Sequence, residues 1–78
     1  MSPLTLEAPP ANQATQALRQ SPIYLLRKIA IEETEATVIL RGTVPSYYMK
    51  QLAQETVLPV LDGRALVNQV AVVPPLGD

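Results

Sequence analysis

Two segments in the first half of the chain alternate apolar and polar residues, a pattern typical of half-buried β-strands. They are residues 28–32 and 37–44, and β-branched residues, which strands favour, dominate the second. The positions expected to face the core are Ile29 and Ile31 in the first strand and Val38, Leu40 and Val44 in the second. The short polar run between the strands predicts an antiparallel hairpin. Gly42 lies in register with the second apolar set, where glycine usually marks a bulge or a close approach by a packed helix.

A first helix is predicted ahead of this hairpin, over residues 12–21. Its apolar positions at helical spacing are Ala14, Ala17 and Leu18. Asn12 or Thr15 is expected to cap it, and Ser21 to end it, because the residue before a proline is pushed out of the helical region. Residues 1–11 carry little periodicity and are interpreted as a flexible leader.

A second helix is predicted to begin after Ser46, which follows a proline and is a good N-cap. It is expected to end near Leu58, because Pro59 would break a helix interior. The predicted buried stripe is Met49, Leu52, Ala53, Thr56 and Val57, with Tyr48 at its edge. The residues predicted to face water are Lys50, Gln51, Gln54 and Glu55.

A third strand is predicted over residues 65–73, after the turn signal Asp62-Gly63. Both of its faces are largely apolar, which favours a central strand or one covered on both sides. The order αββαβ predicts an α+β fold, in which two helices pack on one face of a three-stranded mixed sheet. A single small domain is expected over 12–73, followed by a C-terminal tail over 74–78.

Composition narrows the chemistry of this small domain. The 78 residues contain neither histidine nor cysteine, which excludes Cys/His zinc sites, disulfides and histidine-dependent catalytic triads. Six Lys+Arg against seven Asp+Glu give a net charge of −1, which argues against a nucleic-acid partner. We therefore expect neither an enzyme nor a cofactor or metal site. The chain as given shows no secretory signal pattern, so a cytoplasmic location is expected, or the cell envelope if this is a domain of a longer protein.

The run Val38-x-Leu40-x-Gly42-x-Val44-x-Ser46 resembles the hallmark strand and turn of the BON domain (bacterial OsmY and nodulation). The positions that carry the resemblance are Leu40, Gly42, Val44, Ser46, Ala53, Gly63, Asn68, Val70 and Val72. The chain departs from the family at Pro59, which interrupts the helix, and at Arg64, where the family usually has valine. The resemblance implies a non-catalytic αββαβ module, without a cofactor, that attaches to phospholipid membranes or cell-envelope components.

The candidate binding surface combines aromatic and basic residues. Its members are Lys28, Arg41, Tyr47, Tyr48 and Lys50, with Arg27 adjoining. Tyrosine is favoured at membrane interfaces, and basic residues attract anionic headgroups. The alternative interpretation is structural: Tyr48 closes the edge of the core, Tyr47 lies on the surface, and the basic residues are ordinary solvated sheet residues.

A second function class stays open beside membrane binding. The outer face of the third strand, with Val67, Ala71 and Val73, needs a cover. The leader, a partner chain or a second domain would supply it. A protein-interaction or homo-oligomerisation module is therefore the alternative function, and simple burial of this face stays open beside it. The acidic run at the predicted hairpin tip is Glu32, Glu33 and Glu35. It is interpreted as a solvated turn, because hairpin tips are exposed and the run lacks a calcium-loop pattern.

Overall fold

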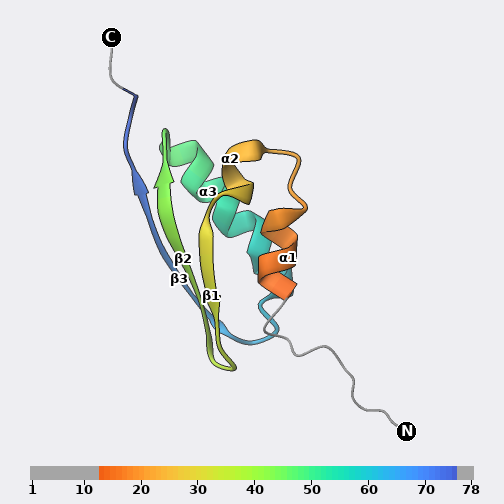
Figure 1. Cartoon of the computed structure of the whole chain (residues 1–78). Coiled ribbons are helices and arrows are strands. Elements are labelled where there is room, and N and C mark those ends of the chain that lie inside the picture. Colours follow the sequence, from red (N-terminus) through yellow and green to blue (C-terminus); the bar gives the residue numbers. More distant parts are fainter. Residues whose placement is uncertain (1–12, 76–78) are drawn as a thin grey trace, which may run out of the picture.

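A computed structural model describes residues 13–75 (Figure 1). The predicted leader therefore lies outside the described residues, as does the end of the predicted tail. The elements in chain order are the helices α1 (Gln13–Arg19) and α2 (Tyr24–Arg27), the strands β1 (Ala30–Glu33) and β2 (Thr37–Val44), helix α3 (Tyr47–Val57), the 3-10 helix η2 (Leu58–Val60) and strand β3 (Ala65–Val72).

The predicted α+β fold is confirmed. The three strands form one mixed sheet in the order β1-β2-β3, with β1 antiparallel and β3 parallel to β2. The helices lie together on one side of this sheet (Figure 1). The parallel pair follows from the connection, since α3 carries the chain back across the sheet before β3 begins.

The position of β3 corrects one prediction. β2 is the central strand, and β3 lies at an edge of the sheet. Two apolar faces in a strand indicate burial on both sides, but no element of residues 13–75 covers the face turned away from the helices, where Val67 and Val73 are 37% and 56% exposed. An apolar sequence thus occupies an uncovered edge strand of eight residues.

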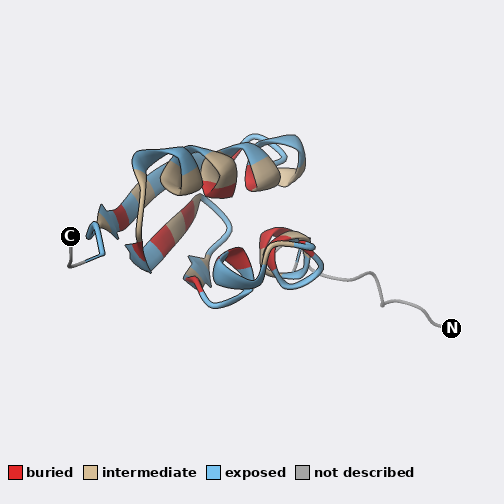
Figure 2. Cartoon of the chain, turned by 90° about the horizontal axis from the view of Figure 1, so that it is seen from above, coloured by how far each residue is buried: buried red, intermediate tan, exposed pale blue. Residues whose placement is uncertain are grey.

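The core lies between the sheet and the helices, where the buried residues face one another (Figure 2). Its members are Ala14, Leu18, Leu26, Ile29, Val38, Leu40, Val44, Ala53, Val57 and Val70. The inward set predicted for β2 is confirmed in full. In the helices, Leu18, Ala53 and Val57 also lie where the spacing places them.

Helix α3 begins as predicted, because the Ser46 hydroxyl accepts a hydrogen bond of 3.2 Å from the backbone N–H of Met49. Its last turn gives way to η2, which contains Pro59. The sequence did not predict α2, a single turn whose only buried residue is Leu26. Four residues are too few for a helical period to be detected. Lys28, assigned to the first strand, instead closes α2 as its C-cap.

Two further expectations concern single residues. Gly42 has φ 135°, in the region that side chains disfavour. A Cβ there would lie 3.8 Å from the Ile29 Cα, an ordinary contact, so backbone conformation rather than a close helix explains this glycine. Thr15 lies inside α1 and is not its N-cap, and Asn12 lies outside the described residues.

Candidate functional site

The topology gives the domain two chemically different ends. One end of the sheet contains the last residues of β2 and β3, the start of α3, and α2. The other end contains the β1–β2 hairpin, η2 and the start of β3 (Figure 1). We call the first the tyrosine end, made of Arg19, Tyr24, Arg27, Lys28, Tyr47, Tyr48 and Lys50. We call the second the acidic end, made of Glu33, Glu35, Glu55, Asp62 and Arg64. The net charge of −1 conceals this separation of charge along the strands.

All three tyrosines of the chain lie at the tyrosine end, and all are exposed. Tyr24, Tyr47 and Tyr48 have 59%, 63% and 69% of their surface open to solvent. The expectation that Tyr48 lies at the edge of the core is therefore wrong. Consecutive helical residues point about 100° apart, and it is the next residue, Met49, that packs against the core.

Three basic residues of the tyrosine end, Arg19, Arg27 and Lys28, contact neutral groups. The Arg27 guanidinium donates to the Ser21 carbonyl at 2.8 Å and lies 5.5 Å from the centre of the Tyr24 ring. The Lys28 ammonium lies 5.2 Å from the same ring. Such contacts between a cation and an aromatic face are attractive but leave the charge in place. The Arg19 guanidinium donates to the carbonyls of Arg27 and Ile29, each at 3.1 Å.

Within residues 13–75, no carboxylate forms an ion pair with a basic residue of the tyrosine end, because the two ion pairs found there lie elsewhere. The candidate surface predicted from the sequence contains Lys28, Tyr47, Tyr48 and Lys50 of this end but not Tyr24. The signal that was available is the placement of an aromatic residue three and four positions ahead of Arg27 and Lys28.

Arg41 does not join the other candidate residues. It lies on the open face of the sheet, where its guanidinium forms an ion pair of 2.7 Å with Glu32 and donates to the Gln69 side chain at 3.2 Å. The predicted basic cluster of Arg41 with Arg27 and Lys28 is therefore replaced by two separate arrangements. Both side chains of the Arg41–Glu32 pair are about half exposed, at 52% and 55%.

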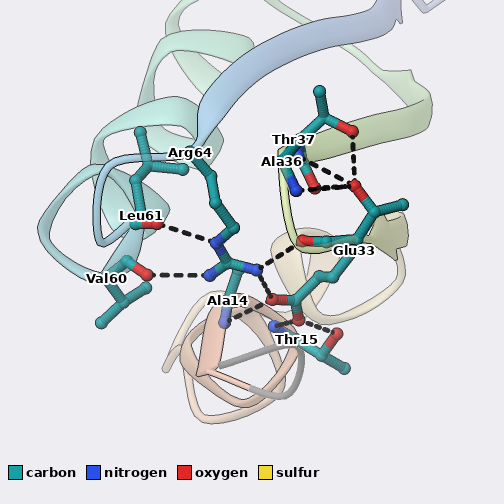
Figure 3. Close-up of polar contacts among 9 residues, drawn as sticks. Ala14, Thr15, Glu33, Ala36, Thr37, Val60, Leu61 and Arg64 are labelled. Carbon is teal, nitrogen blue, oxygen red and sulfur yellow. Dashed lines mark hydrogen bonds and ion pairs between the residues drawn. The ribbon is translucent and has the colours of Figure 1, made fainter. Parts of the chain in front are cut away.

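The acidic end contains a buried ion pair, which overturns the prediction of a solvated turn for Glu33, whereas Glu32 and Glu35 are exposed as predicted. The carboxylate of Glu33 accepts from the Arg64 guanidinium at 2.8 Å, and the two side chains are only 2% and 3% exposed (Figure 3). The other guanidinium nitrogens donate to the carbonyls of Leu61 and Val60, at 2.8 and 3.0 Å. Arg64, which departs from the family pattern, thus has a hydrogen-bond acceptor for each nitrogen of its guanidinium group.

Glu33 also serves the first turn of α1. Its carboxylate accepts from the backbone N–H groups of Ala14 and Thr15 and from the Thr15 hydroxyl, at 3.4, 2.7 and 2.6 Å (Figure 3). Burial by itself would raise the pKa of Glu33, but the hydrogen bonds from Thr15 and Arg64 outweigh it and lower that pKa. The carboxylate therefore stays charged and joins α1, β1 and the loop before β3.

The residues of the family resemblance have structural roles. Leu40, Val44, Ala53 and Val70 are buried, and Val72 packs partly buried against them. Gly42 and Gly63 have positive φ angles, and Ser46 caps α3. The Asn68 amide donates to the Lys50 carbonyl at 3.2 Å and to the Gln54 side chain at 3.4 Å, while its oxygen accepts from the Val70 N–H at 3.2 Å. Asn68 thus fastens β3 to α3.

Residues 13–75 contain no pocket and no cluster of three or more side chains suited to hold a metal ion. None of the helices in this part of the chain is long and apolar enough to cross a bilayer. No protein-family model, curated protein or solved structure matched the chain. The resemblance to the BON domain accordingly stays a prediction from the residues that carry it.

Proposed function

We propose that this chain is a non-catalytic binding module that attaches to anionic phospholipid surfaces through its tyrosine end. The observation that carries the proposal is the gathering of three exposed tyrosines with basic side chains that no described carboxylate neutralises. A tyrosine ring enters the interfacial layer of a bilayer while its hydroxyl stays hydrated. The surrounding cations attract phosphate groups at about 1 kcal/mol for each one that reaches the surface.

The acidic end gives this attachment a direction. Glu35 lies in the turn between β1 and β2, Glu55 near the end of α3, and Asp62 between η2 and β3. These segments lie at the other end of the sheet from α2 and the start of α3 (Figure 1). An anionic surface attracts one end of the domain and repels the other, so the strands stand steeply on the membrane rather than lying along it. Because these forces are screened over about 10 Å at 0.1 M salt, attachment weakens as salt is added.

The test is co-sedimentation of the full chain with vesicles of phosphatidylcholine alone or mixed with phosphatidylserine, at low and moderate salt. We expect pelleting only with the phosphatidylserine vesicles, reduced by salt. Absence from the pellet under every condition overturns the proposal.

Matched variants locate the surface. Lys28→Gln and Arg41→Gln remove the same charge, but only Lys28 belongs to the tyrosine end. We expect Lys28→Gln to weaken binding severalfold and Arg41→Gln to leave it nearly unchanged, because Arg41 is already neutralised by Glu32. Equal effects of the two variants would show that total charge, and not this end, controls attachment.

A further inference from the structure

Within residues 13–75, no strand pairs with the outer edge of β3, and the strand itself is unusually neutral. The N–H groups of Ala65 and Val73 donate to carbonyls beside and within β2, at 2.9 and 2.8 Å, so odd-numbered residues bond inward. The even-numbered residues therefore direct their N–H and C=O groups to the free edge. Natural edge strands are commonly blocked by charges, prolines or bulges. Residues 65–73 contain no charged residue and no proline, and their pairing with β2 is continuous.

We infer that two copies of this chain pair through β3, antiparallel and centred on Gln69, to form a six-stranded sheet. The centre follows from the sequence around the strand. Arg64 precedes residues 65–73 and Pro74 follows them, so only a two-fold axis at Gln69 uses the whole neutral stretch of both copies. This inference does not rest on lipid binding, and it concerns the chain away from a membrane, because antiparallel pairing sets an acidic end beside each tyrosine end.

The same register places side chains of similar chemistry opposite one another in the two copies. On the open face, Val67 of each copy lies opposite Ala71 of the other, and Val73 opposite Ala65. Val67 and Val73, which are 37% and 56% exposed in one chain, each gain an apolar neighbour. On the helix face, Leu66 lies opposite Val72. Asn68 and Val70 form a hydrogen-bonded pair, and the Val70 N–H exchanges the Asn68 side-chain oxygen for the Asn68 carbonyl of the second copy.

Charge complementarity identifies the occupant as a second copy. Antiparallel pairing places the tyrosine end of one copy beside the acidic end of the other. The basic residues of one copy and the acidic residues of the other then lie at the same end of the six-stranded sheet. A parallel arrangement would set like charges together, so the separation of charge along the strands selects the antiparallel one.

The molar mass of the full chain in solution, measured by sedimentation equilibrium over a range of concentrations, tests the inference. We expect a monomer–dimer equilibrium. Gln69→Lys sets two lysines opposite each other across the axis, where Cα atoms of a non-hydrogen-bonded pair lie about 4.5 Å apart. We expect it to raise the dissociation constant about tenfold or more, while the monomer stays folded because Gln69 is exposed.

Two comparisons separate edge pairing from other contacts. Thr43→Lys adds the same charge to the same open face but on the central strand, and is expected to leave the dissociation constant nearly unchanged. An equimolar mixture of Gln69→Lys and Gln69→Glu chains is expected to recover the dimer, because opposite charges then meet at the axis. A wild-type monomer at millimolar concentration overturns the inference. So does a dimer weakened by Thr43→Lys but not by Gln69→Lys, which would indicate packing of one sheet face on another.

Hydrogen exchange gives a readout at single residues. In the dimer, the N–H groups of Leu66, Asn68 and Val72 bond across the axis, so we expect their exchange to slow as protein concentration rises. The N–H of Ala65, bonded within its own chain, is the internal control. Exchange at Leu66 and Val72 that does not depend on concentration, in a sample that is dimeric, contradicts pairing through this edge.

Discussion

The two ends of the domain use charged residues in opposite ways. At the acidic end, Glu33 and Arg64 are buried and each is satisfied by several hydrogen bonds. At the tyrosine end, Arg27 and Lys28 are exposed and contact a carbonyl and an aromatic ring, and no carboxylate among the described residues forms an ion pair with them. In the first arrangement the charged groups bind one another and hold elements of the fold together. In the second, the charged groups stay accessible to a partner. Residue type alone does not separate them; burial and pairing do.

The largest expected effect comes from breaking the buried pair. Arg64→Leu leaves the Glu33 carboxylate buried without its partner, and Glu33→Leu does the same to the guanidinium. Each single variant is expected to lower the free energy of unfolding by about 3–5 kcal/mol. Urea denaturation measures this loss, and the double variant is expected to lose much less than the sum of the single ones.

The exposed ion pair on the open sheet face is the matched control for that experiment. Arg41→Leu removes a partner of Glu32 whose side chain is about half exposed. The expected loss of unfolding free energy is no more than about 1 kcal/mol, because solvent screens the pair. A loss at Arg41 as large as that at Arg64 would contradict the contrast between buried and exposed charge.

A smaller effect on the same network follows from pH. Because the folded state lowers the pKa of Glu33 from its ordinary value of about 4.5, the ionised form contributes stability at pH values above that unfolded pKa. That contribution is lost as pH falls through the lower folded pKa. Urea denaturation between pH 7 and pH 3 is expected to show it, and Glu33→Gln is expected to have a flatter profile. A profile as steep in Glu33→Gln as in the wild type would assign the acid sensitivity to other carboxylates.

At the tyrosine end, the next expected effect is the loss of the Ser46 cap. Ser46→Ala removes the acceptor for the Met49 N–H and is expected to lower the unfolding free energy by about 1 kcal/mol. The first turn of α3, which carries Tyr47 and Tyr48, is then expected to fray. Thermal unfolding monitored by circular dichroism measures the loss, and Ser46→Asp, which retains a capping oxygen, is expected to recover most of it.

The smallest expected effect on stability comes from the tyrosines themselves. Tyr47→Ser combined with Tyr48→Ser is expected to change the unfolding free energy by no more than about 0.5 kcal/mol for each substitution, because both side chains are exposed. Binding to phosphatidylserine vesicles is expected to be lost in the same variant. A large loss of stability would instead assign the two tyrosines a structural role.

The elements with a clear repeat were predictable from the sequence. The alternation in β2 identified Val38, Leu40 and Val44 as core, and Ser46 and Pro59 marked the two ends of α3. Most of the candidate surface was also predictable, because aromatic and basic residues next to a helix start are visible in the sequence. The single turn α2 was missed, since its four residues complete no repeat.

What the sequence determined by itself was the order of the elements, the inward face of β2 and the limits of α3, because these depend on residues close together in the chain. Only the tertiary structure decided the burial of Glu33, whose partner Arg64 lies 31 residues away. It also decided that β3 lies at the edge of the sheet and that Arg41 lies on the open sheet face rather than at the tyrosine end. Each of these depends on which strands pair, and that choice is set by long-range packing rather than by any local pattern.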